Sequence, residues 1–169
     1  MGDVFKEQLV KRLPNTIDLL KKIGSIVAAM FLTLFLLATP ILGPFSMLIV
    51  VAIWFGIYFL FSFFKIEYEY SFTNGSLDID VIYSKSRRKR LFTGDVKDFE
   101  IMARTDNKDR MAEFSKADTT LDYSSGSSDA LTYAFLTRHK GKTVKVIIQP
   151  NDMMLQAIAT VLSPRKFFR

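Results

Sequence analysis

The feature that most constrains this chain is a stretch of 42 consecutive residues, 23–64, that contains no Asp, Glu, Lys, Arg or His. A transmembrane helix requires about 20 predominantly apolar residues, so this stretch is long enough for two. A soluble domain distributes its apolar residues throughout the sequence. The stretch therefore excludes a simple soluble protein, and it leaves residues 65–169 for one small domain.

One break divides the uncharged stretch, at residues 40–44, where two prolines flank Ile-Leu-Gly. Proline removes a backbone donor, and glycine allows the chain to reverse. We therefore expect a transmembrane hairpin over residues 23–64, with helices over 23–39 and 45–64 that are about 26 and about 30 Å long. A re-entrant or monotopic hairpin, which does not cross the whole bilayer, is the alternative.

Basic residues flank only the outer ends of the two expected helices, and the connection between the helices carries no charge. Before the first helix lie Lys11, Arg12, Lys21 and Lys22, and after the second lies Lys65. The positive-inside rule then predicts a multi-pass protein of the cell membrane with both termini in the cytoplasm. No ionisable residue lies inside the apolar segments, which argues against a transporter or pump.

Small residues four positions apart occur in both expected helices. Such pairs allow helix backbones to approach closely in lipid. The pairs are Gly24 with Ala28, Ser25 with Ala29, and Ala52 with Gly56. They predict helix packing, either within the hairpin or between copies of the chain; chance spacing in alanine-containing segments is the alternative.

Residues 1–22 form an amphipathic N-terminal lead-in. Within residues 3–13 the apolar side chains fall near one face of a helix, opposite the charged ones. The apolar set is Phe5, Leu9, Val10 and Leu13, and the charged set is Lys6, Glu7 and Lys11. We expect a short helix lying in the inner membrane interface, ended by Pro14.

From residue 66 the hydrophobic pattern alternates, as is typical of β-strands. Asn74-Gly75, the favoured centre of a type I′ turn, separates two alternating runs. With these two residues at the turn, paired positions sum to 149 and every inward pair is apolar, as Tyr70 opposite Ile79. The outward face then pairs Glu69 with Asp80, a like-charge contact that a basic neighbouring strand would relieve.

Further strands are expected near residues 98–103, 130–138 and 143–149, with a weaker candidate within 112–121. Residues 105–110 and 122–129 are polar and are expected to be loops. Residues 150–162 show helical periodicity, and Pro164 stops the helix. About seven short strands are therefore closed by one C-terminal helix, around a core of Leu77, Ile79, Val81, Phe99, Ile101, Phe135, Val146, Ile148, Leu155 and Ile158.

The order of these elements, a membrane hairpin followed by a strand-rich module with one C-terminal helix, resembles the bacterial pleckstrin-homology-like (PH-like) membrane proteins. Residues 67–102 (EYEYSFTNGSLDIDVIYSKSRRKRLFTGDVKDFEIM) are similar to uncharacterised families of that layout. The resemblance implies an α+β membrane protein whose residues 65–169 form a cytoplasmic PH-like antiparallel β-sandwich or barrel capped by the C-terminal helix. No catalytic signature comes with it.

The resemblance also implies that classical PH domains bind phosphoinositides through basic residues on their first strands. The corresponding positions here carry carboxylates: Glu67, Glu69, Asp78 and Asp80. This departure argues against phosphoinositide recognition of the eukaryotic kind. The same carboxylates lie on the solvent side of alternating strands, where charged residues are usual, so they do not indicate acid–base catalysis.

Residue types exclude several kinds of chemistry. The chain has no cysteine and one histidine, His139, so thiolate and multi-histidine metal sites are impossible. Residues 106–109 lack the spacing of a calcium loop, and no glycine-rich phosphate loop is present. We therefore predict no catalytic residues, no metal site and no cofactor.

The basic run of residues 85–90 is the one segment that suggests a binding role. It contributes Lys85, Arg87, Arg88, Lys89 and Arg90 to a net charge of +6. The predicted register returns this run to the level of Lys65, where the chain leaves the expected hairpin. We therefore assign it, with Lys65, to contact with anionic lipid headgroups; pairing with the acidic strand face is the alternative. A nucleic-acid role would require a broader basic face.

The last residues, 165–169, join cations to two phenylalanines. They either dip into the membrane interface or dock on the sandwich.

Two functions are compatible with these features, together with a less favoured enzymatic one. The first is a membrane-anchored, non-catalytic PH-like module that binds a protein partner or acts as a scaffold. The second is a structural subunit of a membrane complex that self-associates through its hairpin.

Overall fold

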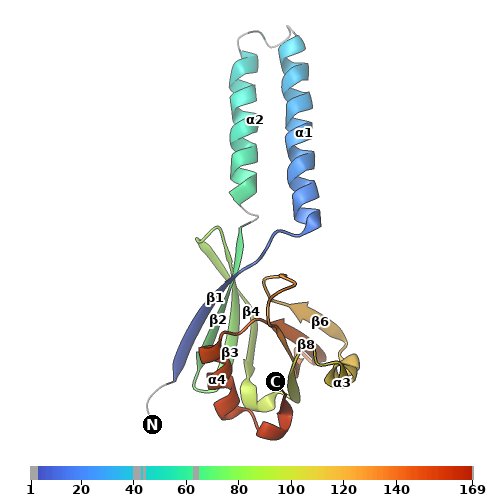
Figure 1. Cartoon of the computed structure of the whole chain (residues 1–169). Helices are drawn as coiled ribbons and strands as arrows, with labels where there is room; N and C mark the ends of the chain where they lie inside the picture. The colour runs from blue at the N-terminus through green and yellow to red at the C-terminus, as the bar shows by residue number, and fades with distance from the viewer. Residues whose placement is uncertain (1–3, 40–42, 44, 63–64, 169) are drawn as a thin grey trace. The chain divides into compact units, whose positions relative to one another are not determined.

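The computed structural model describes residues 4–39, 43, 45–62 and 65–168. The chain divides into two compact units. The sandwich unit comprises Met1–Leu13, Glu67–Ile82 and Arg87–Arg169, and the hairpin unit comprises Pro14–Ile66 and Tyr83–Ser86. Figure 1 shows the elements in chain order.

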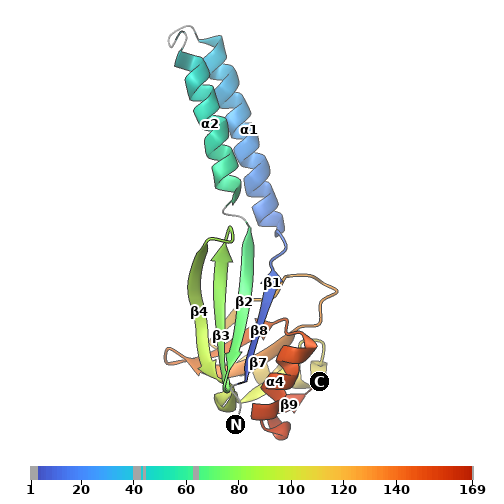
Figure 2. The ribbon, with the colours of Figure 1, turned by 90° about the vertical axis from the view of Figure 1, so that its left-hand side faces the viewer.

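In the hairpin unit, helices α1 (Thr16–Ala38) and α2 (Phe45–Ser62) run antiparallel, side by side (Figures 1 and 2). Helix α1 begins at Thr16 rather than at residue 23, because Asn15 and Asp18 form a capping box. The Asn15 Oδ1 atom accepts a hydrogen bond from the Thr16 N–H, and Asp18 Oδ2 accepts one from the Asn15 N–H. The end of the expected lead-in, residues 16–22, is therefore helical.

By length and composition, α1 is the one helix in the described part of the chain that can span a membrane. Helix α2 is apolar but shorter over its described residues, Phe45–Phe61. At the expected break, Gly43 has a φ of +48°. The rest of the break, residues 40–42 and 44, and the predicted end of the second helix, residues 63–64, lie outside the described residues.

Among the described residues, the first sheet contains four strands in the order β1-β2-β3-β4 (Figure 2). They are β1 (Phe5–Lys11), β2 (Ile66–Thr73), β3 (Ser76–Tyr83) and β4 (Arg87–Asp95). The predicted hairpin is confirmed: Asn74 and Gly75 both have positive φ, 49° and 96°, as a type I′ turn requires. At its open end the Ser84 N–H donates to the Lys65 carbonyl at 2.9 Å, which joins the two residues that the predicted register pairs.

The expected helix over residues 3–13 is wrong, because Phe5–Lys11 within this segment form strand β1. It pairs antiparallel with β2, with Gln8 opposite Tyr70 and Val10 opposite Tyr68. Val10 is buried, whereas Leu9 on the other face of the strand is exposed. The N-terminal residues therefore complete the sandwich unit, and that unit does not begin at residue 65 as expected.

The second sheet has the order β6-β8-β7-β5-β9 within the described residues. Its strands are β5 (Ile101–Arg104), β6 (Thr119–Asp122), β7 (Tyr133–His139), β8 (Lys142–Ile148) and β9 (Phe167–Phe168). The pairs β6–β8 and β5–β9 are parallel. An entirely antiparallel sandwich was expected, so these two pairs correct that prediction.

Helix α4 (Asp152–Val161) is the predicted C-terminal helix. Asn151 caps it by accepting a hydrogen bond from the Met154 N–H at 2.8 Å. All ten predicted core residues are buried. Ile101, however, belongs to a second apolar cluster and not to one common core.

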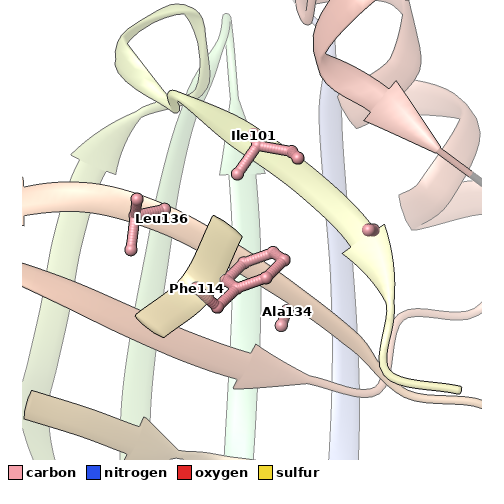
Figure 3. Close-up of a cluster of buried hydrophobic side chains, with 5 residues drawn as sticks. Ile101, Phe114, Ala134 and Leu136 are labelled. Carbon is pink, nitrogen blue, oxygen red and sulfur yellow. The ribbon is translucent and has the colours of Figure 1, made fainter. Parts of the chain in front are cut away.

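The second cluster lies on the face of β5 and β7 that carries Ile101, Ala103, Ala134 and Leu136. Figure 3 shows Phe114 lying over Ile101, Ala134 and Leu136. Phe114 comes from the 3-10 helix η3 (Ala112–Lys116), which follows the short helix α3 (Lys108–Met111). The segment that the sequence marked as a polar loop and a weak strand therefore supplies a cover for this face of the second sheet.

Candidate functional site

The outward face of the first sheet carries a cluster of ionisable side chains, which we call the charged face. It consists of Glu7, Lys11, Glu67, Glu69, Asp78, Asp80, Arg88 and Arg90. Strand β4 lies beside β3, and its arginines reach the acidic residues of both β2 and β3. The like-charge pair of Glu69 and Asp80 is thus relieved by a basic neighbouring strand.

Two arginines make the ion pairs of this face. Arg88 Nη2 lies 2.7 Å from Oε1 and 2.5 Å from Oε2 of Glu69. Arg90 contacts Asp80 through Nε and lies 2.8 Å from Asp78 Oδ2 through Nη1. The hydrogen bond to Asp80 is the main reason why the pKa of Arg90 is raised. Arg88 and Arg90 therefore pair with the acidic strand face, which was the alternative to lipid contact for the basic run.

Two of the carboxylates are buried, although alternation alone predicts that they face solvent. Glu69 is 2% exposed and Asp80 is 6% exposed. Burial, a hydrogen bond with Glu7 and the charge of Glu7 together raise the pKa of Glu69 to about 7, while Arg88 opposes the shift. The place of Glu7 and the burial of Glu69 were not predicted from the sequence, because strand β1, which brings Glu7 to the charged face, was expected to be a helix.

The two lysines of residues 85–90 differ from these two arginines. Lys85 and Lys89 are exposed, and neither forms an ion pair within the described residues. Ser84 and Lys85 have positive φ values of 50° and 59° in the turn between β3 and β4, and the Ser86 N–H donates to the Tyr83 carbonyl. This turn presents Lys85 at its tip, whereas Arg88 and Arg90 lie within β4.

Lysines gather at one end of the hairpin unit. Antiparallel packing brings the start of α1, with Lys21 and Lys22, to the same end as Lys65, which follows α2. The hydrogen bond from the Ser84 N–H to the Lys65 carbonyl places the turn with Lys85 there as well. We call Lys21, Lys22, Lys65 and Lys85 the lysine group; Asp18 is the acidic residue of the described part of this unit.

The four small residues predicted to pack, Gly24, Ala28, Ala52 and Gly56, are exposed. A Cβ atom added to Gly24 or Gly56 would meet nothing within 4 Å. Ala29 is the buried residue of α1. Packing of these four residues within the hairpin is therefore not observed, and packing between copies of the chain stays a prediction.

Two other candidate features belong to the packing of the sandwich. Phe167 and Phe168 form β9 beside Met102 and Ala103. These two residues therefore dock on the sandwich and are not free to enter the membrane interface. Arg169 lies outside the described residues. The Phe168 ring has the guanidinium of Arg110 3.9 Å from its centroid. The His139 ring is half-buried, and its centroid lies 5.2 Å from that of the Phe92 ring.

No group of three or more His, Cys, Asp or Glu side chains in the described residues is arranged to hold a metal ion. The charged face instead holds Glu69, Asp78 and Asp80 paired with Arg88 and Arg90. Its arrangement suits electrostatic cohesion of the four strands.

The two sheets and the C-terminal helix define an α+β domain of the PH-like class. Residues 2–169 match the family described as Bacterial PH-like domain (DUF6106), and the chain belongs to this family. The resemblance inferred from the sequence is thereby confirmed. No curated protein and no solved structure matches the chain. Membership indicates a binding or scaffold module, since PH-like domains generally bind lipids or proteins.

Proposed function

We propose that this protein is a membrane-anchored PH-like binding or scaffold module on the inner face of a bacterial membrane, without catalytic activity of its own. Helix α1 supplies one span by length and composition. Helix α2, with residues 63–64, supplies a second span in this proposal, because the uncharged stretch continues through residue 64. The basic residues that flank the uncharged stretch, 23–64, favour an orientation with both termini in the cytoplasm.

The observation that carries the proposal is the lysine group at one end of the helix pair, where Asp18 is the one acidic residue of the described part of the hairpin unit. The other end, around Gly43, has no ionisable residue in the sequence. Anionic lipids of the inner leaflet attract basic residues by about 1 kcal/mol for each Lys or Arg near the surface. Four lysines at one end therefore favour one orientation in the bilayer and hold that end at the headgroups.

We further propose that the lipid contact of the basic run is made by Lys65, Lys85 and Lys89. Arg88 and Arg90 contribute less, because their guanidinium groups already bind Glu69, Asp78 and Asp80. The proposed lipid contact is thus limited to some of the cations of residues 85–90 and does not involve all of them equally. It also provides an internal comparison, since the two groups of cations alternate along the same segment.

The test uses the full chain in lipid nanodiscs, with a single cysteine introduced at Ser86 in the turn that carries Lys85. A fluorophore at this position is quenched by brominated lipids when it lies near the bilayer. We expect stronger quenching when part of the phosphatidylcholine is replaced by phosphatidylglycerol, and less of this difference at high salt. Lys85→Ser with Lys89→Ser should remove most of the difference.

The matched control is Lys140→Ser with Lys142→Ser, which makes the same charge change at the turn between β7 and β8. It should leave the quenching unchanged. Equal quenching in the two lipid compositions, or an equal effect of both double variants, would contradict specific contact of the β3–β4 turn with anionic lipid.

A second candidate function is a structural subunit that self-associates through its helices. The exposed Gly24, Ala28, Ala52 and Gly56 favour it, because small residues on a lipid-facing surface allow another helix to approach. Copurification from gently solubilised membranes separates the two functions. A different protein in fixed stoichiometry supports the binding module, and self-assembly alone supports the structural subunit.

A further inference from the structure

Strand β1 is an edge of the first sheet, since the strand order is β1-β2-β3-β4 (Figure 2). An edge strand has backbone N–H and C=O groups that no neighbouring strand uses. The pairing of β1 with β2 determines which residues carry these groups. The Asn74 N–H donates to the Val4 carbonyl at 3.1 Å, and Gln8 lies opposite Tyr70 in the same register.

In an antiparallel pair, residues that exchange backbone hydrogen bonds alternate with residues that do not. Since the bond from Asn74 falls on Val4, the even-numbered residues of β1 direct their backbone groups to β2. The odd-numbered residues direct theirs to the other side of the strand, which we call the open edge; they are Phe5, Glu7, Leu9 and Lys11. In the described part of the chain these groups form no hydrogen bond on that side.

The side chains of the same four residues are also exposed. Phe5 is 56% exposed and Leu9 is 57% exposed, although both are large and apolar. Glu7 and Lys11 are exposed as well. Alternate residues of a strand share one face, so these side chains form one row in the order apolar, acidic, apolar, basic. The open edge therefore combines unpaired backbone groups with a specific pattern of side chains.

An extended peptide segment fits such an edge, because its own N–H and C=O groups complete the unpaired ones and add a strand to the sheet. Side chains directly opposite one another in an antiparallel pair interact, and opposite charges there are favourable. The matching segment has a basic residue opposite Glu7, an apolar residue opposite Leu9 and an acidic residue opposite Lys11.

A second copy of β1 would also match these charges, since antiparallel pairing with Leu9 opposite Leu9 puts Glu7 opposite Lys11. The same register puts Phe5 of one copy opposite Leu13 of the other. The Leu13 N–H, however, already donates to the Ser125 carbonyl at 2.8 Å. The chain at Ser125 thus occupies the place that Phe5 of a second copy would need, whereas a segment that pairs only with Phe5–Lys11 avoids it.

We propose that the open edge of β1 binds an extended segment of a partner protein, antiparallel to Phe5–Lys11, with basic, apolar and acidic side chains opposite Glu7, Leu9 and Lys11. This inference rests on the proposed function in one respect, that the PH-like domain is a binding module. It does not depend on lipid contact by the basic run, so either can fail while the other holds.

The probe is the synthetic peptide TETVTKTVT, blocked at both ends, whose glutamate, central valine and lysine match Lys11, Leu9 and Glu7. It is added to the full chain in detergent micelles, and backbone amide exchange is measured by NMR. Without peptide, we expect the amides of Glu7 and Leu9 to exchange faster than those of Gln8 and Val10, which face β2. Saturating peptide should slow the exchange of Glu7 and Leu9 several-fold.

Glu7→Lys should weaken binding of this peptide several-fold, because it places two lysines opposite each other. The peptide TETVTETVT, with glutamate in place of the lysine, should bind Glu7→Lys as the first peptide binds the wild type. The matched control is Glu100→Lys, which makes the same charge change at an exposed glutamate outside β1. It should bind the first peptide like the wild type.

Leu9→Pro removes an N–H of the open edge, at a position where an edge strand tolerates proline. It should abolish binding, whereas Leu9→Ala keeps the N–H and should retain most of it. A lack of saturable binding, or binding that leaves the exchange of Glu7 unchanged, would overturn the proposal. So would protection of Glu7 and Leu9 that rises with protein concentration without peptide, because a second copy would then cover the edge. The wild-type exchange decides the matter even if a variant fails to fold.

Discussion

Gln8 and Asn151 are joined by a hydrogen bond across 143 residues of sequence: the Asn151 backbone N–H donates to Gln8 Oε1 at 2.7 Å. The Nε2 group of Gln8 also donates to the Gln149 carbonyl at 2.8 Å. One amide side chain on β1 therefore satisfies two backbone groups at the start of α4. Residues that precede the apolar helices are thereby attached to residues near the end of the chain, within the same sandwich unit.

We expect Gln8→Ala to destabilise the sandwich unit by about 0.5–1.5 kcal/mol, because it removes the hydrogen bonds to the exposed Asn151 N–H and the half-buried Gln149 carbonyl. Lys6→Ala is the control, since Lys6 lies on the same strand but is exposed. Urea unfolding of the full chain in detergent, followed by tyrosine fluorescence, measures both. Equal midpoints for the two variants would show that the Gln8 hydrogen bonds contribute nothing to stability.

Gly75→Ala should also destabilise the protein, by roughly 1 kcal/mol or more. Gly75 has a φ of +96°, which a residue with a Cβ atom adopts only with strain. A Cβ atom would also lie 3.5 Å from Val161, so space alone does not forbid it. Thermal unfolding gives the comparison, with Ser76→Ala as the neighbouring control. An unchanged unfolding temperature would contradict the strain account.

Phe114→Ala should destabilise the protein by about 3–5 kcal/mol, since it removes the ring that covers the second apolar cluster. The exposed neighbour Ser115, which bonds to the Ala112 carbonyl, provides the control Ser115→Ala. Faster hydrogen exchange of β5 and β7 should accompany the loss of stability in the first variant only. Normal protection of these strands would show that η3 is not needed to cover them.

Gly24→Ile with Gly56→Ile distinguishes contact between copies from packing within the hairpin. Both positions have open space for a side chain, so the fold of the hairpin should be retained. If the small residues mediate self-association, chemical cross-linking of dimers in membranes should fall several-fold. Undiminished cross-linking would remove the support that these residues give to the structural-subunit function.

Local sequence signals predicted much of this fold. The β2–β3 hairpin follows from Asn74-Gly75 and two alternating runs, and α4 follows from its cap at Asn151 and its periodicity. Both depend on residues close together in the chain. The core positions followed as well, because alternation determines which side chains of a strand point inward.

Strand β1 could not be predicted in the same way. Phe5, Leu9 and Leu13 fit the period of a helix, and the partner strand lies beyond the two apolar helices. The error had a chemical consequence, because without β1 nothing indicates that Glu7 lies on the same face as Glu69 or that Glu69 is buried. The parallel pairing of Phe167 with Met102 is likewise a contact between distant segments, and no local pattern signals it.

The most direct test of the account is the topology of the chain in the membrane. Since the chain contains no cysteine, single cysteines at Gly43 and at the exposed Ser128 can be probed in intact cells with a membrane-impermeant maleimide. The account predicts labelling of Gly43→Cys in cells whose inner membrane is intact, and labelling of Ser128→Cys only after that membrane is permeabilised. Labelling of Ser128→Cys from outside, or protection of Gly43→Cys until permeabilisation, would contradict a two-span anchor with a cytoplasmic PH-like domain.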